Sequence, residues 1–212
     1  MSIQKAYDQW SATYDMDENL TRDLDQTITK NILAGFTCNT ILEIGCGTGK
    51  NTHLLAQIAQ TVYAIDFSQG MIAKARLQIQ AENVIFSVAD LTKKWAIEDH
   101  SIDLVVCNLV LEHIENLSFV FGEVYRVLGK GGKFFISELH PFKQYQGNQA
   151  KFQQEGEITK VQAFLHHISD FLNAANENGL RLLKLDEWWH ENDHNKPPRL
   201  VTFILEKSIN SP

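Results

Sequence analysis

Short hydrophobic runs alternate with helical patterns along most of the chain after about residue 40. Runs rich in β-branched and aliphatic residues predict strands at Thr40–Ile44, Thr61–Ile65, Val84–Val88, Ile102–Cys107, Lys133–Ser137, Leu180–Leu185 and Leu200–Glu206. Between them, apolar spacings of three and four predict helices after Ser68, over Val120–Leu128 and over Val161–Ala175. Strands that alternate with helices indicate βαβ crossovers, so we expect an α/β fold whose mostly parallel sheet is covered on both faces.

Two segments fall outside this alternation. Residues 1–36 predict helices placed before the first strand, with Leu20, Leu24, Ile28 and Ile32 at helical spacing. Residues 139–160 show little periodicity and predict a long loop or lid, since loops of this length in compact domains are usually functional or disordered. We therefore expect one domain over 1–212: an N-terminal cover (1–36), a core (37–138), a lid (139–160) and the C-terminal part of the sheet (161–212).

Composition and charge narrow the class of protein. Nineteen Lys and Arg against 26 Asp and Glu give a formal net charge of −7, which disfavours binding to nucleic acid or to an anionic membrane surface. No apolar run approaches the roughly 20 residues of a membrane-spanning helix, and no secretory signal is visible. Three widely spaced cysteines indicate a reducing compartment, so we expect a cytoplasmic protein. Together with the charge and the length, this favours a single-domain protein that acts on a small molecule, and we expect a monomer or homodimer.

The most informative stretch is the loop after the first predicted strand, Gly45-Cys46-Gly47-Thr48-Gly49, preceded by Glu43. Glycines at such a turn allow positive φ and let a ligand approach the backbone closely. Asp66 ends the next strand, where a carboxylate grips the ribose diol of a nucleotide in such sheets. The spacing does not fit a dinucleotide fingerprint, because Lys50 occupies the position of the third glycine, and Glu43 would repel a pyrophosphate. A tight turn without a ligand remains the alternative.

Several ordered motifs together resemble the class I S-adenosylmethionine-dependent methyltransferases, in particular the type 11-like branch that acts on small molecules. They are the glycine loop, Asp66, Val88-Ala89-Asp90, Leu111-Glu112-His113-Ile114, and Arg126-Val127-Leu128-Gly129-Lys130-Gly131-Gly132. The N-terminal Tyr7-Asp8 and Tyr14-Asp15 also match the entry of that branch. The resemblance implies a Rossmann-like, doubly wound, seven-stranded sheet with an antiparallel last strand.

The resemblance also implies roles for single residues. Glu43 is expected to hold or orient the methionine ammonium side of the cofactor, partly through water. Asp66 is expected to bind the ribose hydroxyls and Asp90 the adenine amine, with Phe67 and Met71 against the adenine. The full expected cofactor set is Tyr14, Glu43, Gly45, Cys46, Gly47, Asp66, Phe67, Met71, Ala89, Asp90, Leu91, Asn108 and Leu109. Helix capping by Asp66 and Asp90, and plain packing by Phe67 and Met71, are the alternatives.

Two histidines are candidates for a general base, because methyl transfer needs one only when the attacking atom must lose a proton. His140 opens the predicted lid and His113 follows the fourth strand; a turn-forming role before Pro141 is the alternative for His140. No metal site is expected, because His190 and His194 lie among turn-forming residues although their spacing would suit helical ligands. Glu138 is expected to orient His140 or to contact a cationic acceptor.

The predicted function is methyl transfer from S-adenosylmethionine to a small or medium-sized acceptor, with release of S-adenosylhomocysteine. Two alternatives remain open: an NAD(P)-dependent oxidoreductase, and a catalytically silent protein that binds S-adenosylmethionine for a partner. The sequence does not choose the acceptor or the atom that is methylated.

Overall fold

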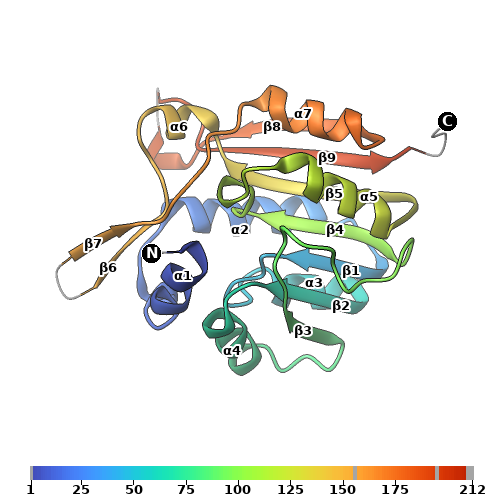
Figure 1. The fold of residues 1–212 in the computed structure, drawn as a ribbon, viewed down its shortest axis with the longest axis horizontal. Helices are drawn as coiled ribbons and strands as arrows, with labels where there is room; N and C mark the ends of the chain where they lie inside the picture. The colour runs from blue at the N-terminus through green and yellow to red at the C-terminus, as the bar shows by residue number, and fades with distance from the viewer. Residues whose placement is uncertain (1, 155–156, 194–195, 209–212) are drawn as a thin grey trace.

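Seven strands form one sheet in the computed structural model, which describes residues 2–154, 157–193 and 196–208 (Figure 1). The strand order is β3-β2-β1-β4-β5-β9-β8, and β9 runs antiparallel to both of its neighbours while the other pairs are parallel. The bounds are β1 Cys38–Ile44, β2 Ala59–Asp66, β3 Val84–Val88, β4 Ile102–Asn108, β5 Leu128–Leu139, β8 Leu180–Trp188 and β9 Leu200–Lys207. The predicted seven-stranded sheet with an antiparallel last strand is therefore confirmed.

The helices and the remaining strands surround this sheet. Their bounds are α1 Ile3–Trp10, η1 Tyr14–Met16, α2 Leu20–Leu33, α3 Thr52–Ile58, α4 Gln69–Gln78, η2 Leu111–His113, α5 Leu117–Val127, α6 Pro141–Tyr145, β6 Lys151–Gln154, β7 Glu157–Lys160, α7 Ile168–Glu177 and η3 Glu191–Asp193. Among these described elements, no helix is long and apolar enough to cross a membrane.

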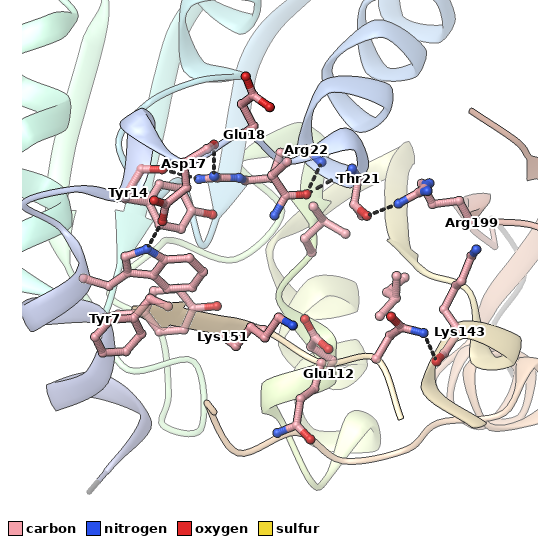
Figure 2. A pocket seen from close by; sticks show the side chains of 18 of the residues that line it. Tyr7, Tyr14, Asp17, Glu18, Thr21, Arg22, Glu112, Lys143, Lys151 and Arg199 are labelled. Carbon is pink, nitrogen blue, oxygen red and sulfur yellow. Dashed lines mark hydrogen bonds between the residues drawn. The ribbon is translucent and has the colours of Figure 1, made fainter. Parts of the chain in front are cut away.

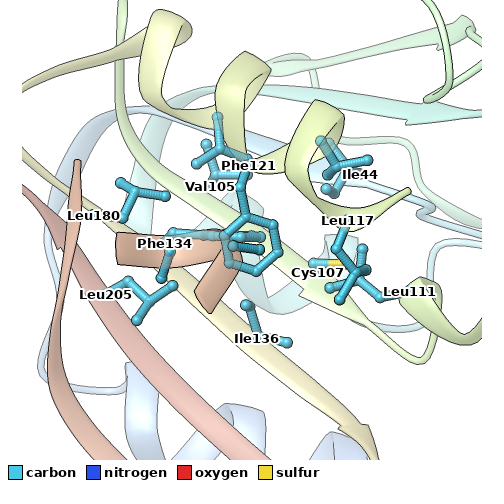
Figure 3. Close-up of a cluster of buried hydrophobic side chains, with 14 of the residues drawn as sticks. Ile44, Val105, Cys107, Leu111, Leu117, Phe121, Phe134, Ile136, Leu180 and Leu205 are labelled. Carbon is cyan, nitrogen blue, oxygen red and sulfur yellow. The ribbon is translucent and has the colours of Figure 1, made fainter. Parts of the chain in front are cut away.

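Two apolar layers hold the sheet between its helices. Successive residues of β4 alternate between them: Val105 and Cys107 pack with α5 and α7, whereas Leu104 and Val106 pack with α2, α3 and α4. Figure 3 shows the first layer, in which Phe121 of α5 meets Phe134 of β5 edge-to-face, with ring centroids 5.4 Å apart. Burial on both faces explains why these strands read as continuous apolar runs in the sequence.

The helix predicted over Val161–Ala175 begins later than expected. The structure has a helix only over α7, because Asp170 and His167 form a capping box that fixes its start. Val161 lies instead in extended chain and packs with Trp10 of α1 and Phe152 of β6. Val161, before His167, thus packs on α1 and β6, whereas the apolar residues of α7 after His167 pack on the sheet.

Residues 139–160, predicted as a loop, contain α6 and the antiparallel hairpin of β6 and β7. The hairpin packs on α1 through Phe152, whose ring stacks on Trp10 with centroids 5.3 Å apart. The N-terminal cover and the predicted lid therefore form one small apolar cluster of their own.

Candidate functional site

The glycine loop joins β1 to the helix α3 by a turn that only glycine fits without strain. Gly45 has φ +71°, and a Cβ there would lie 2.2 Å from a methyl carbon of Val110, in the loop after β4. The Gly45 and Cys46 amides both donate to the Ile65 carbonyl, at 2.7 and 3.0 Å. This arrangement brings the carboxyl ends of the parallel strands β1, β2 and β4 together, along the edge of the sheet that these strand ends form.

Asp66, at the end of β2, organises this edge. Its carboxylate accepts hydrogen bonds from the amides of Gly47 (2.9 Å) and Ser68 (2.8 Å), one at each oxygen. Burial raises the pKa of Asp66 to about 6, although these backbone hydrogen bonds oppose the shift. Each carboxylate oxygen has two lone pairs, so each retains one acceptor position.

A cavity of about 190 Å³ opens at this edge. Ten of the expected cofactor residues line it: Tyr14, Gly45, Gly47, Asp66, Phe67, Met71, Asp90, Leu91, Asn108 and Leu109. Ile3, Tyr7, Thr92, Val110, His113 and Ile114 complete its wall. The structure thus brings together residues that span most of the first half of the chain.

Three expected residues do not line this cavity: Glu43, Cys46 and Ala89. Glu43 is buried beneath the glycine loop and accepts a 2.5 Å hydrogen bond from the Thr52 hydroxyl of α3. Desolvation raises the pKa of Glu43 to about 8, and the Thr52 hydrogen bond opposes this. Glu43 thus contacts α3 through Thr52 and does not line the cavity, so its expected role toward the methionine ammonium, partly through water, stays a prediction.

Asp90 and Asn108 each use part of their side chain locally. Asp90 accepts from the Thr92 amide (3.0 Å) and hydroxyl (2.6 Å) and pairs with Lys93; burial raises its pKa, but these contacts lower it overall. Asn108 donates to Asp25 and to Thr29, both at 2.8 Å. Leu109 follows with φ +56°, a conformation that a branched side chain rarely adopts and that often occurs at functional sites.

The N-terminal helices cover this edge from the other side. Asp8 of α1 accepts from the Ser68 hydroxyl (2.6 Å) and the Gly70 amide (3.1 Å), at the start of α4. The Thr48 hydroxyl of the glycine loop donates to Asp15 at 2.7 Å. Two acidic residues of the N-terminal segment thus fasten it to the loop and helix that form the cavity.

The buried stripe of α2 differs from the one that its apolar residues predict. Leu20 is exposed, while Arg22, Asp25 and Thr29 are buried together with Ile28 and Leu33. The Arg22 guanidinium donates to the carbonyls of Tyr14 (2.6 Å) and Asp17 (2.8 Å) and lies 4.1 Å from the Tyr14 ring centroid. Spacing of three and four also relates these polar residues, and that is the signal that could have identified them.

Tyr7 and His113 form a pair that no local pattern predicts, since 106 residues separate them. The Gln162 carbonyl can only accept, so His113 Nδ1 carries the proton and donates to it at 2.8 Å. Nε2 is then an acceptor for the Tyr7 hydroxyl at 2.7 Å. Burial raises the pKa of Tyr7 well above its usual range, so the phenol keeps its proton and can donate it in the hydrogen bond to Nε2.

His140 has a different environment. Its Nδ1 accepts from the Phe142 amide at 3.2 Å, capping α6, and its Nε2 donates to Glu187 at 2.8 Å. Burial lowers the pKa of His140, and the residue lines neither cavity described here. His140 thus has a local structural role before Pro141, as the turn-forming alternative supposed, and here it caps α6; a role as general base has no support in this geometry.

Glu138 does not orient His140 as expected. It accepts from the amides of Val110 (2.9 Å) and Leu111 (2.8 Å) and so fixes the loop after β4. Of the two histidines considered for a metal, His190 accepts from the Asn192 amide at Nδ1 (3.1 Å), while His194 lies outside the described residues.

A larger cavity of about 580 Å³ adjoins the first, because Tyr7, Tyr14 and Leu109 line both (Figure 2). Its wall comes from the N-terminal segment, from η2, from α6 with the following loop and hairpin, and from Arg199 just before β9. Small-molecule sites usually have about 300–1,000 Å³, so this volume suits a second ligand beside the first. The site therefore has two compartments with one shared wall.

Comparison with known proteins gives this arrangement a family. Residues 42–136 match the family model of a methyltransferase domain. This stretch is similar to methyltransferase domains. The resemblance to class I S-adenosylmethionine-dependent methyltransferases, inferred from the motifs, is thereby confirmed.

Individual relatives match parts of the chain. Demethylmenaquinone methyltransferase of Leptospira interrogans is 37% identical over 109 residues, which are 49% of this chain and 44% of that protein. Ubiquinone biosynthesis O-methyltransferase of Xanthomonas oryzae pv. oryzae is 32% identical over 105 residues, 47% of this chain and 43% of that protein. The chain thus spans less than half the length of these curated relatives, and the match centres on the methyltransferase domain.

Solved structures extend the likeness to the whole fold. An S-adenosylmethionine-dependent methyltransferase from Mesorhizobium loti superposes with a TM-score of 0.74 at 20% identity, over 89% of this chain and all of that one. DhpI, solved in complex with S-adenosylhomocysteine, gives a TM-score of 0.75 at 20% identity, over 98% of this chain and 97% of that one. At this identity the likeness establishes the fold.

Proposed function

We propose that the chain transfers a methyl group from S-adenosylmethionine to a small or medium-sized acceptor and releases S-adenosylhomocysteine. The observation that carries the proposal is the meeting of two cavities at Tyr7, Tyr14 and Leu109, on the edge of the sheet where open α/β folds bind ligands. The names of three relatives support an acceptor that is a small molecule: demethylmenaquinone methyltransferase, ubiquinone biosynthesis O-methyltransferase and phosphoethanolamine N-methyltransferase.

The residues of the smaller cavity fit the cofactor. Asp66 retains acceptor positions for two ribose hydroxyls, and Phe67 and Met71 offer apolar surface for the adenine. Arg22 lines the larger cavity beside Tyr14, which both cavities share. Its buried guanidinium donates to two carbonyl oxygens and lies against aromatic rings, so it suits the methionine carboxylate where the two cavities meet. When bound, the cofactor supplies a methyl group on a positively charged sulfur.

Tyr7 and His113 are our candidates for handling the acceptor's proton. Tyr7 faces both cavities and His113 the smaller one, which is where donor and acceptor would meet. An acceptor hydroxyl or amine that hydrogen-bonds to the Tyr7 oxygen could pass its proton there as the Tyr7 proton moves to His113 Nε2. The remaining task of the chain is to orient the two ligands and to exclude water.

The alternative functions make different predictions. An NAD(P)-dependent enzyme would place a pyrophosphate near the glycine loop, where the Asp66 carboxylate would oppose it. A catalytically silent protein would bind the cofactor but release no product.

Calorimetry with S-adenosylhomocysteine, NAD and NADP tests the first distinction, and we expect binding of S-adenosylhomocysteine alone. Incubation with S-adenosylmethionine and pools of small metabolites tests the second, with S-adenosylhomocysteine release as the readout. No binding of either cofactor form would refute the proposal. Binding without release from any pool would favour the silent protein.

If release is found, Tyr7→Phe and His113→Gln should lower its rate at neutral pH. The dissociation constant of S-adenosylhomocysteine should change less in these variants than the rate does. Rates equal to wild type in both variants would remove the pair from the mechanism.

A further inference from the structure

Two basic side chains and one acid form a buried cluster on the wall of the larger cavity. Asp193 of η3 accepts from Arg199 at both oxygens, at 2.6 and 2.7 Å, and its carboxylate lies 3.6 Å from the Lys143 ammonium of α6. Arg199 also donates to the Thr21 hydroxyl of α2 at 3.1 Å. The hydrogen bonds from Arg199 hold the pKa of Asp193 at about 2, so the cluster contains one negative and two positive charges.

The unmatched charge lies at Lys143. Only 9% of this residue is exposed, and among the described residues its ammonium has no hydrogen-bond acceptor; Asp193, at 3.6 Å, is beyond hydrogen-bond distance. Lys143 Nζ is not among the fully buried polar atoms that lack a partner, so its unused donors are accessible to an anion, and a largely buried cation favours such a partner. Lys143 and Arg199 both line the larger cavity, so an anion bound there would be within the wall that they form.

The cluster lies away from the expected reaction centre. Figure 2 shows Lys143 and Arg199 on one side of the cavity and Tyr7 and Tyr14 on the other. The acids that line the same cavity are Asp17, Glu18 and Glu112. Asp17 accepts from the Trp10 indole at 2.7 Å, and burial raises the pKa of Glu112, which disfavours its charged form. In Figure 2 Asp17 and Glu18 lie near Tyr14 and Arg22, not near Lys143.

We propose that the methyl acceptor is an anion whose carboxylate or phosphate group binds to Lys143 and Arg199, while its reacting atom points toward Tyr7. This inference rests on the proposed function, since it names the class of molecule that occupies the second compartment. Asp193 then acts as a positioning residue that holds Arg199 in place. The donor would be bound at the opposite wall, so the anion anchor would fix the direction in which the acceptor presents its nucleophile.

The experiment uses benzoate and phenyl phosphate as probes and benzamide as the neutral analogue of benzoate. Calorimetry first measures S-adenosylhomocysteine binding, and the loaded protein is then titrated with each probe. Wild type, Lys143→Met, Lys143→Arg and the control Lys130→Met are compared; Lys130 is an exposed residue at the other end of the sheet. We expect wild type to bind one or both anions. Benzamide should bind at least tenfold more weakly than benzoate. Lys143→Met should lower the affinity for the bound anion at least tenfold.

The other variants separate the possible sources of the anion. Lys143→Arg should retain anion binding and Lys130→Met should match wild type. A preference for benzoate or for phenyl phosphate identifies the group. An unchanged S-adenosylhomocysteine affinity in Lys143→Met excludes the cofactor's own carboxylate as the anion that Lys143 binds, whereas a tenfold loss would overturn the assignment to the acceptor.

Two further outcomes would overturn the inference without touching the proposed function. One is S-adenosylhomocysteine binding with no binding of either anion. The other is equal anion affinity in wild type and in a Lys143→Met variant that melts cooperatively. If S-adenosylhomocysteine itself does not bind, the proposed function fails, and titration of the unloaded protein still tests the anion site. Should Lys143→Met not fold, Lys143→Gln serves in its place and the carboxylate–amide comparison on wild type remains decisive.

Discussion

Replacing Asp66 with alanine should weaken cofactor binding far more than it weakens the fold. Asp66 has two acceptor positions left after its bonds to Gly47 and Ser68, and these suit the two ribose hydroxyls. A hydrogen bond to a charged group contributes about 1.5–3 kcal/mol, so two lost bonds cost at least about 3 kcal/mol. Since about 1.4 kcal/mol is a factor of ten, the dissociation constant of S-adenosylhomocysteine should rise by about 100-fold.

Asp103 provides a matched control. Its carboxylate also accepts from two backbone amides, those of Asn39 (2.8 Å) and Thr40 (3.0 Å), but it belongs to the opposite end of β4 and lines neither ligand cavity. Asp103→Ala should lower the melting temperature and leave S-adenosylhomocysteine affinity within twofold of wild type. Calorimetry at pH 7.5, with melting curves for each variant, makes the comparison. An unchanged dissociation constant in a folded Asp66→Ala variant would refute the ribose role.

Asp66 also predicts how cofactor affinity depends on pH. Burial raises the pKa of Asp66 to about 6, so below pH 6 its carboxyl is protonated and loses acceptor capacity. Cofactor hydroxyls favour the ionised form, and bound protein therefore has a lower pKa than free protein. Affinity should fall by up to tenfold per pH unit as the pH decreases below about 6. An Asp66→Asn variant should bind weakly and without this dependence; an equal pH slope in the variant would assign the titration to another group.

Four further substitutions test residues that hold the glycine loop and the hairpin in place. Burial raises the pKa of Glu43 to about 8, so the folded chain keeps a proton that the unfolded chain releases, and stability is lost as the pH rises from about 5 to 8. Glu43→Gln should reduce that slope by up to about 1.4 kcal/mol per pH unit in urea titrations, and an unchanged slope would contradict the assignment. Gly45→Ala should lower the free energy of unfolding by at least about 2 kcal/mol, because the added Cβ clashes with Val110 at a backbone φ that already disfavours alanine. At Gly47, which also has a positive φ, a Cβ would meet open space. Gly47→Ala should therefore lower the free energy of unfolding by only about 1–2 kcal/mol. Trp10→Ala should expose the β6–β7 hairpin to limited proteolysis, because the Trp10 ring stacks on Phe152; a cleavage rate equal to wild type would show that the hairpin is held elsewhere.

The sheet was predictable because burial on both faces imposes a pattern that a single sequence displays. All seven strands occur where apolar runs predict them, and Val84–Val88 has the same bounds. The glycine loop and Asp66 were predictable for a related reason, since their roles depend on backbone conformation and on the order of strands. These features are encoded locally or at fixed spacing.

The rest of the site depends on contacts between distant segments. Tyr7 meets His113 across 106 residues, and Lys143 meets Asp193 across the end of the sheet. Arg22 on α2 was missed because a polar residue on an amphipathic helix normally faces solvent. The sequence order of these groups contains no information on which of them share a wall, so the acceptor compartment emerges only from the structure.

Burial also changes what the net charge means. The formal value of −7 counts every carboxyl as ionised, but burial raises the pKa of both Glu43 and Glu138 to about 8. Both groups are therefore largely neutral at pH 7, and the effective charge is about two units less negative. The charge near each ligand also differs from the net charge of the chain. Asp66 lines the smaller cavity, which we propose for the cationic cofactor, whereas Lys143, whose ammonium has no hydrogen-bond acceptor among the described residues, lines the larger cavity. An acidic chain can thus bind an anionic acceptor, because the field at each binding position is set by the few buried groups around it and not by the total charge.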